Sequence, residues 1–92
     1  MNLFGCLKED ADKVMQVLKL DVEDLRGNCR LRTITAKKAL VSCYLRHEKG
    51  YSLTEIGDYC HKDHSTILYH TKAHANNYAL HREKLIQLTQ EL

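Results

Sequence analysis

Apolar residues recur along the chain at spacings of three and four, the period of one face of an α-helix. Three stretches with this period predict helices over about residues 9–20, 34–49 and 78–92, and a short helix over 22–25 is predicted from the residues that flank it. In the first stretch the apolar positions form a single stripe of Leu7, Ala11, Val14 and Leu18, which we expect to lie in the core.

Residues that commonly cap or end helices lie between these stretches. Asp21 is expected to cap the short second helix, and Gly27-Asn28 to end it. Thr33 is a candidate N-cap for the long helix, and Gly50 is expected to close it. Asn76-Asn77 predicts a break before the last helix. The chain contains no proline, so closely connected helices are predicted from about residue 9 onward.

Two short helices are predicted in the stretch 52–74. Ser52 and Glu55 have the spacing of a capping box, in which each side chain satisfies a free backbone N–H of the other, so a helix should begin at Leu53. Asp63 is a good N-cap for a second helix, whose apolar-to-mixed face carries Ile67, Leu68 and Thr71. Two helices joined across about four residues indicate a helix-turn-helix.

The start of the second helix carries four short polar residues, Asp63, His64, Ser65 and Thr66. In a helix-turn-helix, the N-terminal residues of the second helix enter the DNA major groove. A carboxylate accepts from a cytosine amino group and an imidazole N–H donates to a purine, so Asp63 and His64 are the candidates for base contacts. Plain N-capping is the alternative role for Asp63 and Ser65.

Specific sequence segments resemble the DNA-binding domain at the C-terminal end of the bacterial replication initiator DnaA, whose fold is related to that of the tryptophan repressor. The resemblance rests on Ile56-Gly57 and on Lys62-Asp63-His64-Ser65-Thr66-Ile67-Leu68. It extends upstream through residues 22–25, 30–32 and 36–45, and covers about residues 14–74. The resemblance implies a small all-α domain with a central helix-turn-helix that binds double-stranded DNA sequence-specifically. Its turn is shorter than usual, with Cys60 in place of an aromatic or aliphatic residue, and His70 stands where a small residue is usual.

Length and composition limit the domain organisation and the classes of function that the chain can have. Ninety-two residues predict one domain, with about residues 14–74 as its core and about 78–92 as an additional C-terminal helix. The sequence has no phosphate-binding loop motif, no membrane-spanning apolar run and no signal-peptide pattern, so we expect a cytoplasmic protein without ATPase or other enzymatic activity. No cofactor, membrane or small-molecule substrate is predicted. The four cysteines are scattered singly and are expected to be free thiols.

Positive charge is concentrated in the middle of the chain. The whole sequence carries a net charge of only +2, but residues 26–49 hold seven Lys and Arg against one Glu. Because this run directly precedes the helix-turn-helix, it favours DNA binding over an ordinary solvated face. The cations predicted to contact DNA are Arg30, Arg32, Lys37, Lys38, Lys62 and Lys72.

These cations are expected to have two roles. The lysines are expected to bind phosphates, which fixes register without carrying sequence information. The family resemblance implies that Arg32 enters the minor groove beside the site, where A·T-rich sequence concentrates negative potential.

Three alternatives remain open from the sequence. Cys60, His64, His70 and His74 include an i, i+4 histidine pair that suits zinc, although no paired Cys-x-x-Cys accompanies them. The same fold also suits a protein-interaction module that modulates the replication machinery. An enzyme using His64 is disfavoured because no oxyanion or cofactor feature accompanies it.

The C-terminal stretch has its own apolar stripe of Leu85, Leu88 and Leu92 beside Ile86. It is expected to close the core, with a homodimer contact as the alternative. Control of replication initiation or of transcription is the predicted biological role, and the target sequence is left open.

Overall fold

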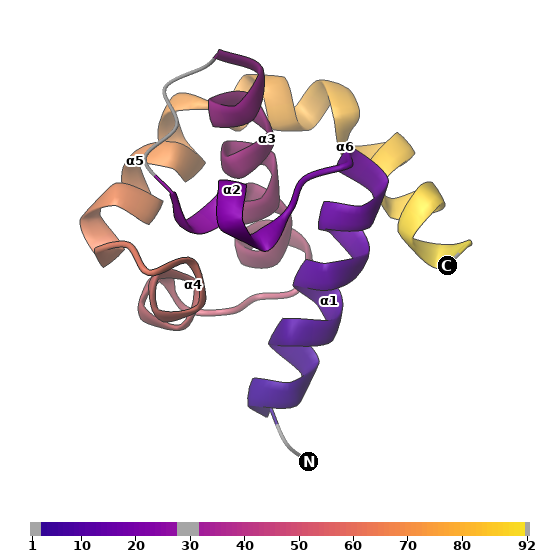
Figure 1. Ribbon diagram of the computed structural model, residues 1–92. Helices are drawn as coiled ribbons and strands as arrows, with labels where there is room; N and C mark the ends of the chain where they lie inside the picture. Colours follow the sequence, from indigo (N-terminus) through magenta and orange to yellow (C-terminus); the bar gives the residue numbers. More distant parts are fainter. Residues whose placement is uncertain (1–2, 28–31, 92) are drawn as a thin grey trace.

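The computed structural model describes residues 3–27 and 32–91, with side chains from Leu7 onward. These residues form α1 (Leu3–Leu18), α2 (Val22–Arg26), α3 (Arg32–Cys43), a π-helical turn (Tyr44–Glu48), α4 (Leu53–Cys60), α5 (His64–Ala73) and α6 (Ala75–Gln90) (Figure 1). The prediction of an all-α fold with a helix-turn-helix is confirmed.

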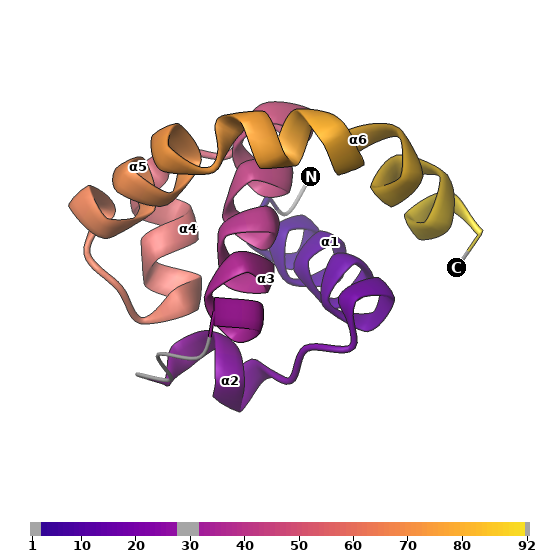
Figure 2. The ribbon, with the colours of Figure 1, turned by 90° about the horizontal axis from the view of Figure 1, so that it is seen from above.

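Helix α3 is the element around which the others pack. It contacts α1, α2, α5 and α6. Figure 2 shows α1 on one flank of α3 and α4 and α5 on the other, and α6 follows α5 and crosses above α3 and α1. Val41, Cys43 and Leu45, the last in the π-helical turn, are fully buried because this segment is covered from several sides. Complete burial of a Val or Leu side chain contributes roughly 1.5–3 kcal/mol to the free energy of folding.

The apolar stripe of α1 packs into the core as predicted. Leu7, Ala11 and Val14 are buried, and Leu18 is partly buried against them. The helix begins at Leu3, six residues before the predicted start at residue 9. Burial of Leu7 explains part of this difference, because the turn that contains it gains packing energy when it is helical.

Two predicted helix boundaries are wrong. Thr33 lies inside α3 and is not its N-cap. Asn76-Asn77 does not interrupt the helical structure, since α6 runs through both residues. The irregular backbone lies instead at His74, with φ −108° and ψ 15°. Tyr78 is buried and its backbone N–H donates to the His74 carbonyl oxygen at 2.9 Å, so the first turn of α6 is held against the core.

The C-terminal stripe contributes to the same core. Leu85 is buried, which confirms the core role predicted for it, while Leu88 is half-buried and Leu92 lies outside the described residues. A dimer contact through Leu85 would therefore have to expose this core side chain. Nowhere in residues 3–27 and 32–91 is a helix both long and apolar enough to cross a membrane.

Hydrogen bonds from two tyrosines tie α4 and its preceding loop to α1. The Tyr51 hydroxyl donates to Asp10 Oδ2 at 2.8 Å, and the Tyr59 hydroxyl donates to Asp12 Oδ1 at 3.2 Å. Arg26 Nε donates to the Tyr59 carbonyl oxygen at 2.8 Å, so the end of α2 is joined to α4 as well. These contacts position the helix-turn-helix on the rest of the fold.

The described cysteines are buried thiols. Cys43 and Cys60 are free, and burial raises the pKa of each to about 11, so both are protonated at neutral pH. The prediction of free thiols is confirmed for these two residues. The side chains of Cys6 and Cys29 lie outside the described part of the structure.

Candidate nucleic-acid interface

The first helix of the motif, α4, begins where the capping box predicts. Ser52 Oγ accepts from the Glu55 backbone N–H at 3.1 Å, and the Ser52 backbone N–H donates to Glu55 Oε1 at 3.2 Å. Leu53 is the first helical residue, and Ile56 is fully buried one turn on. The cap therefore sets where the helix starts, and the core contact of Ile56 sets which face points inward.

The turn closes against Gly57. His61 adopts a left-handed conformation with φ 56° and ψ 41°, and the Lys62 backbone N–H donates to the Gly57 carbonyl oxygen at 2.9 Å. A Cβ at Gly57 would lie 2.6 Å from the Lys62 carbonyl oxygen, closer than real Cβ atoms approach other atoms. The glycine is needed here because the backbone of the turn packs directly against α4.

Helix α5 begins after Asp63, which occupies the N-cap position as predicted. The Asp63 carbonyl oxygen accepts from the backbone N–H groups of Thr66 and Ile67, at 3.0 and 3.2 Å. Its carboxylate makes no capping hydrogen bond. Ile67 is buried and fixes the inner face of α5, whereas His64 and Ser65 in the first turn are exposed.

Three of the residues predicted to read DNA lie together at this helix start. Asp63, His64 and Ser65 are all exposed, with 79% of the Asp63 side chain and 63% of the His64 side chain accessible. His64 Nδ1 lies 3.8 Å from Asp63 Oδ1, a contact too long for a hydrogen bond. Thr66 differs because it is half-buried on the inner side of α5. The exposed group presents an acceptor, an imidazole and a hydroxyl on one surface.

The predicted cations are divided between the surface and the interior. Lys72 is exposed on α5, Arg32 is exposed at the start of α3, and Lys37 is half-buried on α3. Arg30 lies outside the described residues.

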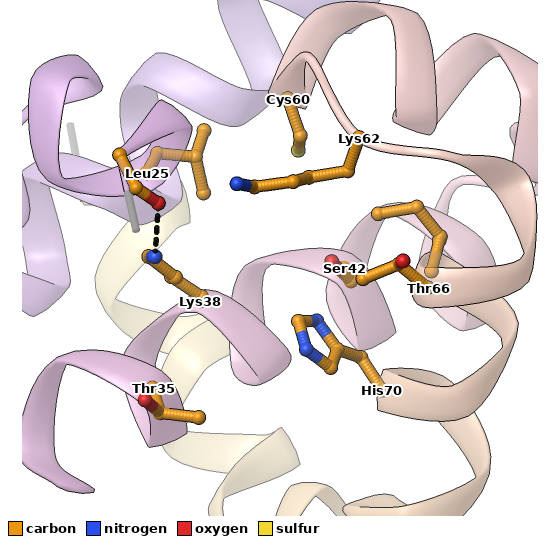
Figure 3. A pocket seen from close by; sticks show the side chains of 10 residues that line it. Leu25, Thr35, Lys38, Ser42, Cys60, Lys62, Thr66 and His70 are labelled. Carbon is orange, nitrogen blue, oxygen red and sulfur yellow. Dashed lines mark hydrogen bonds between the residues drawn. The ribbon is translucent and has the colours of Figure 1, made fainter. Parts of the chain in front are cut away.

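Lys38 lies in the interior, contrary to the expectation of a phosphate contact. It is only 7% exposed, and its Nζ donates to the Gly27 carbonyl oxygen at 2.7 Å, so it links α3 to the end of α2 (Figure 3). Lys62 is half-buried and its side chain extends inward from the turn in the same view. A cluster of positive charge in the sequence does not distinguish such inward lysines from exposed ones.

Two exposed side chains on α5 were missed by the sequence analysis as parts of this surface. Leu68 is 38% exposed and Tyr69 is 66% exposed. Leu68 had been placed on the inner face, whereas Tyr69 follows Ser65 by four residues and precedes Lys72 by three. That helical spacing is the signal that places Tyr69 on the outer face of α5.

The structure does not bring together the four residues of the alternative zinc site. Cys60 is buried behind α5, whereas His64 is exposed in front of it. His70 and His74 are neighbours, with ring centroids 6.3 Å apart in an edge-to-face arrangement. Within the part of the chain that the structure describes, no three His, Cys, Asp or Glu side chains gather closely enough to hold a metal ion.

Comparison with known proteins agrees with this geometry. The family described as the bacterial dnaA protein helix-turn-helix matches residues 11–73, more than two thirds of the chain. A curated relative, the chromosomal replication initiator protein DnaA of Gloeothece citriformis (strain PCC 7424), is 35% identical over 57 residues. That alignment covers 61% of this chain and 13% of the relative, so the chain spans only a small part of the initiator's length.

Proposed function

Because the chain belongs to the bacterial DnaA helix-turn-helix family, whose domain is a non-catalytic module that binds double-stranded DNA, we propose that it reads a specific DNA sequence through α5. The outer face of α5 enters the major groove, with Asp63 and His64 at base edges. Ser65 contacts a phosphate or a base edge beside them, and Tyr69 extends the same surface along the groove.

One observation carries this proposal. Asp63 stands at an N-cap position, yet its carboxylate makes no capping hydrogen bond and is largely exposed. An N-cap carboxylate that only stabilised its helix would accept from a backbone N–H in the first turn. The free acceptor, together with the exposed imidazole of His64, is suited to an outside partner with donors and acceptors on one edge.

The backbone contacts come from the cations that remain accessible. We assign phosphate contacts to Lys72 on α5 and to Lys37 on α3, and the minor-groove contact to Arg32. Lys38 is left out because its ammonium is buried and bound to Gly27. Lys62 and Thr66 face a cavity behind α5, so their contribution to DNA binding is secondary to that of the exposed residues.

The biological role follows from the same family membership. We propose that the chain acts in replication initiation or in transcriptional control by occupying its DNA site, without ATPase activity of its own. Selection of bound duplexes from a random pool tests this directly. An enriched sequence that resembles the site of the initiator would connect the protein to replication origins. A folded protein that enriches no sequence would contradict the proposal and would favour a protein partner for the exposed Leu68 and Tyr69.

Replacing Lys72 with alanine should weaken binding to all duplexes alike. A phosphate contact releases about one counterion, so the plot of log affinity against log salt should flatten by about 0.9. Fluorescence anisotropy over a salt series measures both quantities. Lys84→Ala on α6, also exposed, is the matched control and should leave the slope unchanged. A loss confined to one DNA sequence would contradict the assignment of Lys72 to a phosphate.

Replacing Arg32 with alanine should cost most on sites with an A·T-rich flank. The narrow minor groove of such sequence concentrates negative potential, and an inserted guanidinium gains more there than beside G·C pairs. The measurement compares affinities for two duplexes that share the selected site and differ only in the flank. Equal losses on both duplexes would rule out the minor-groove role.

A further inference from the structure

A polar cavity lies directly behind the proposed DNA-reading helix. Its volume is about 390 Å³, within the usual range for sites that hold small molecules. The lining residues come from the end of α2, from α3, from the end of α4 and the turn after it, and from α5 (Figure 3). Leu25 and Ile67 supply apolar wall, while Thr35, Ser42 and Thr66 supply hydroxyl groups.

Among the described residues that line this cavity, the charged ones are lysines. Lys38 and Lys62 both line it, and none of the described lining residues is Asp or Glu. Lys38 is 7% exposed and takes part in no ion pair among the described residues, although its ammonium donates to the Gly27 carbonyl oxygen. Burying an ammonium without a counter-charge is costly, so an anion in the cavity would be favoured.

His70 adds an unused polar atom. Its Nδ1 is buried and has no hydrogen-bond partner, and the ring points from α5 into the cavity (Figure 3). Burial first, and then the positive neighbours His74, Lys38 and Lys62, lower the pKa of His70 below its ordinary value. The imidazole is therefore neutral at pH 7 and carries one N–H, which is available as a donor when Nδ1 is the protonated nitrogen.

We propose that this cavity binds the phosphate group of a small phosphorylated molecule. Two lysine ammonium groups match the charge of a phosphate monoester, about −1.5 to −2 at neutral pH. The two ammonium groups, the imidazole N–H of His70 and the hydroxyl of Thr66 reach the phosphate oxygens from different walls, as tetrahedral oxyanions require. A bare phosphate would leave much of the volume empty, so the remainder holds the organic part against Leu25 and Ile67.

Binding here would act on the DNA-reading helix. Thr66 and His70 lie one turn apart on the inner side of α5, and Ser65 and Tyr69 lie on its outer side. A ligand held by the inner residues therefore stabilises one position of the helix relative to α3. This regulatory consequence rests on the proposed DNA-binding function, whereas the anion site itself does not.

Titration with potassium phosphate, against potassium chloride at matched ionic strength, tests the site in the full chain. Histidine ring signals in NMR spectra give the location, because His70 lines the cavity and His64 lies on the outer surface. We expect a saturable shift of the His70 signals, a rise in its pKa and a higher Tm, with His64 little changed. A shift of His64 without His70 would overturn the proposal, because the anion would then occupy the DNA-facing surface.

A test variant and a control variant show whether Lys38 contributes to phosphate binding. Lys38→Met keeps the length of the side chain and removes a charge-assisted hydrogen bond, so phosphate affinity should fall about tenfold or more. Lys84→Met, exposed on α6, is the matched control and should keep its affinity; equal affinities in both variants would contradict the site. If Lys38→Met does not fold, the comparison of His70 with His64 in the unmodified protein decides alone.

The DNA backbone is another source of phosphate, and an added duplex distinguishes it from a free ligand. If the cavity binds a free phosphorylated molecule, the His70 signals keep their phosphate-bound positions in the DNA complex. Displacement of phosphate by the duplex would overturn the proposal. DNA affinity measured without phosphate tests the proposed DNA-binding function separately. Either proposal can therefore be contradicted without affecting the test of the other.

Discussion

Replacing His64 with alanine should remove most of the discrimination between the preferred DNA site and unrelated duplexes. A good base contact contributes about 1–3 kcal/mol, which corresponds to a roughly 5- to 150-fold loss of affinity on the preferred site. Non-specific binding should change little, because it depends on phosphate contacts such as that proposed for Lys72. Anisotropy titrations with the selected duplex and with a scrambled one measure the two affinities side by side.

The fold of this variant should be intact. His64 is exposed at the first position of α5, and alanine has a higher helix propensity than histidine. Thermal unfolding followed by circular dichroism checks this, and Lys84→Ala serves as an exposed substitution away from α5. A variant that keeps both its stability and its full sequence preference would show that His64 is an ordinary surface residue. Loss of stability would point instead to a structural role for His64.

The parts of the fold that could be predicted from the sequence depend on local chemistry. The capping box of Ser52 and Glu55 acts within three residues, so its position in the sequence fixes the start of α4. The stripe of α1 is similarly local, because a run of apolar residues at helical spacing must bury one face. The start of α5 was also predicted, although the carboxylate of Asp63 stays free rather than capping the helix.

The errors arise where tertiary contacts, rather than local sequence preferences, determine the structure. Asn76-Asn77 has a weak preference against helix, which the burial of Tyr78 two positions after Asn76 outweighs. Lys38 looks like an exposed cation in the sequence, and only the approach of the Gly27 carbonyl group makes an interior position possible. Leu68 was expected on the inner face because it is apolar, but Ile67 and Thr71 already occupy that face. Sequence patterns give the face of a helix more reliably than the place of one residue at its edge.

Replacing Gly57 with alanine should destabilise the protein, the reverse of the usual effect in a helix. Alanine in place of a helical glycine is normally favourable by about 0.5–1 kcal/mol. Here the added Cβ would lie 2.6 Å from the Lys62 carbonyl oxygen, and this atom belongs to the backbone of the turn, so it cannot rotate away. Overpacking of this kind costs about 1–3 kcal/mol, and each kcal/mol lowers the Tm of a domain of this size by roughly 4–8 °C.

The same clash should weaken DNA binding, because relief requires α5 to move away from α4. The Lys62 backbone N–H that donates to Gly57 would have to shift with it, and the outward residues that follow would change their direction. Asp58→Ala is the matched control, since Asp58 is the next residue of α4 and its side chain is exposed. That substitution should change the free energy of unfolding by no more than about 0.5 kcal/mol. If Gly57→Ala proves as stable as the unmodified protein and binds DNA equally well, then close packing of the turn against α4 is not what sets the angle between the two helices.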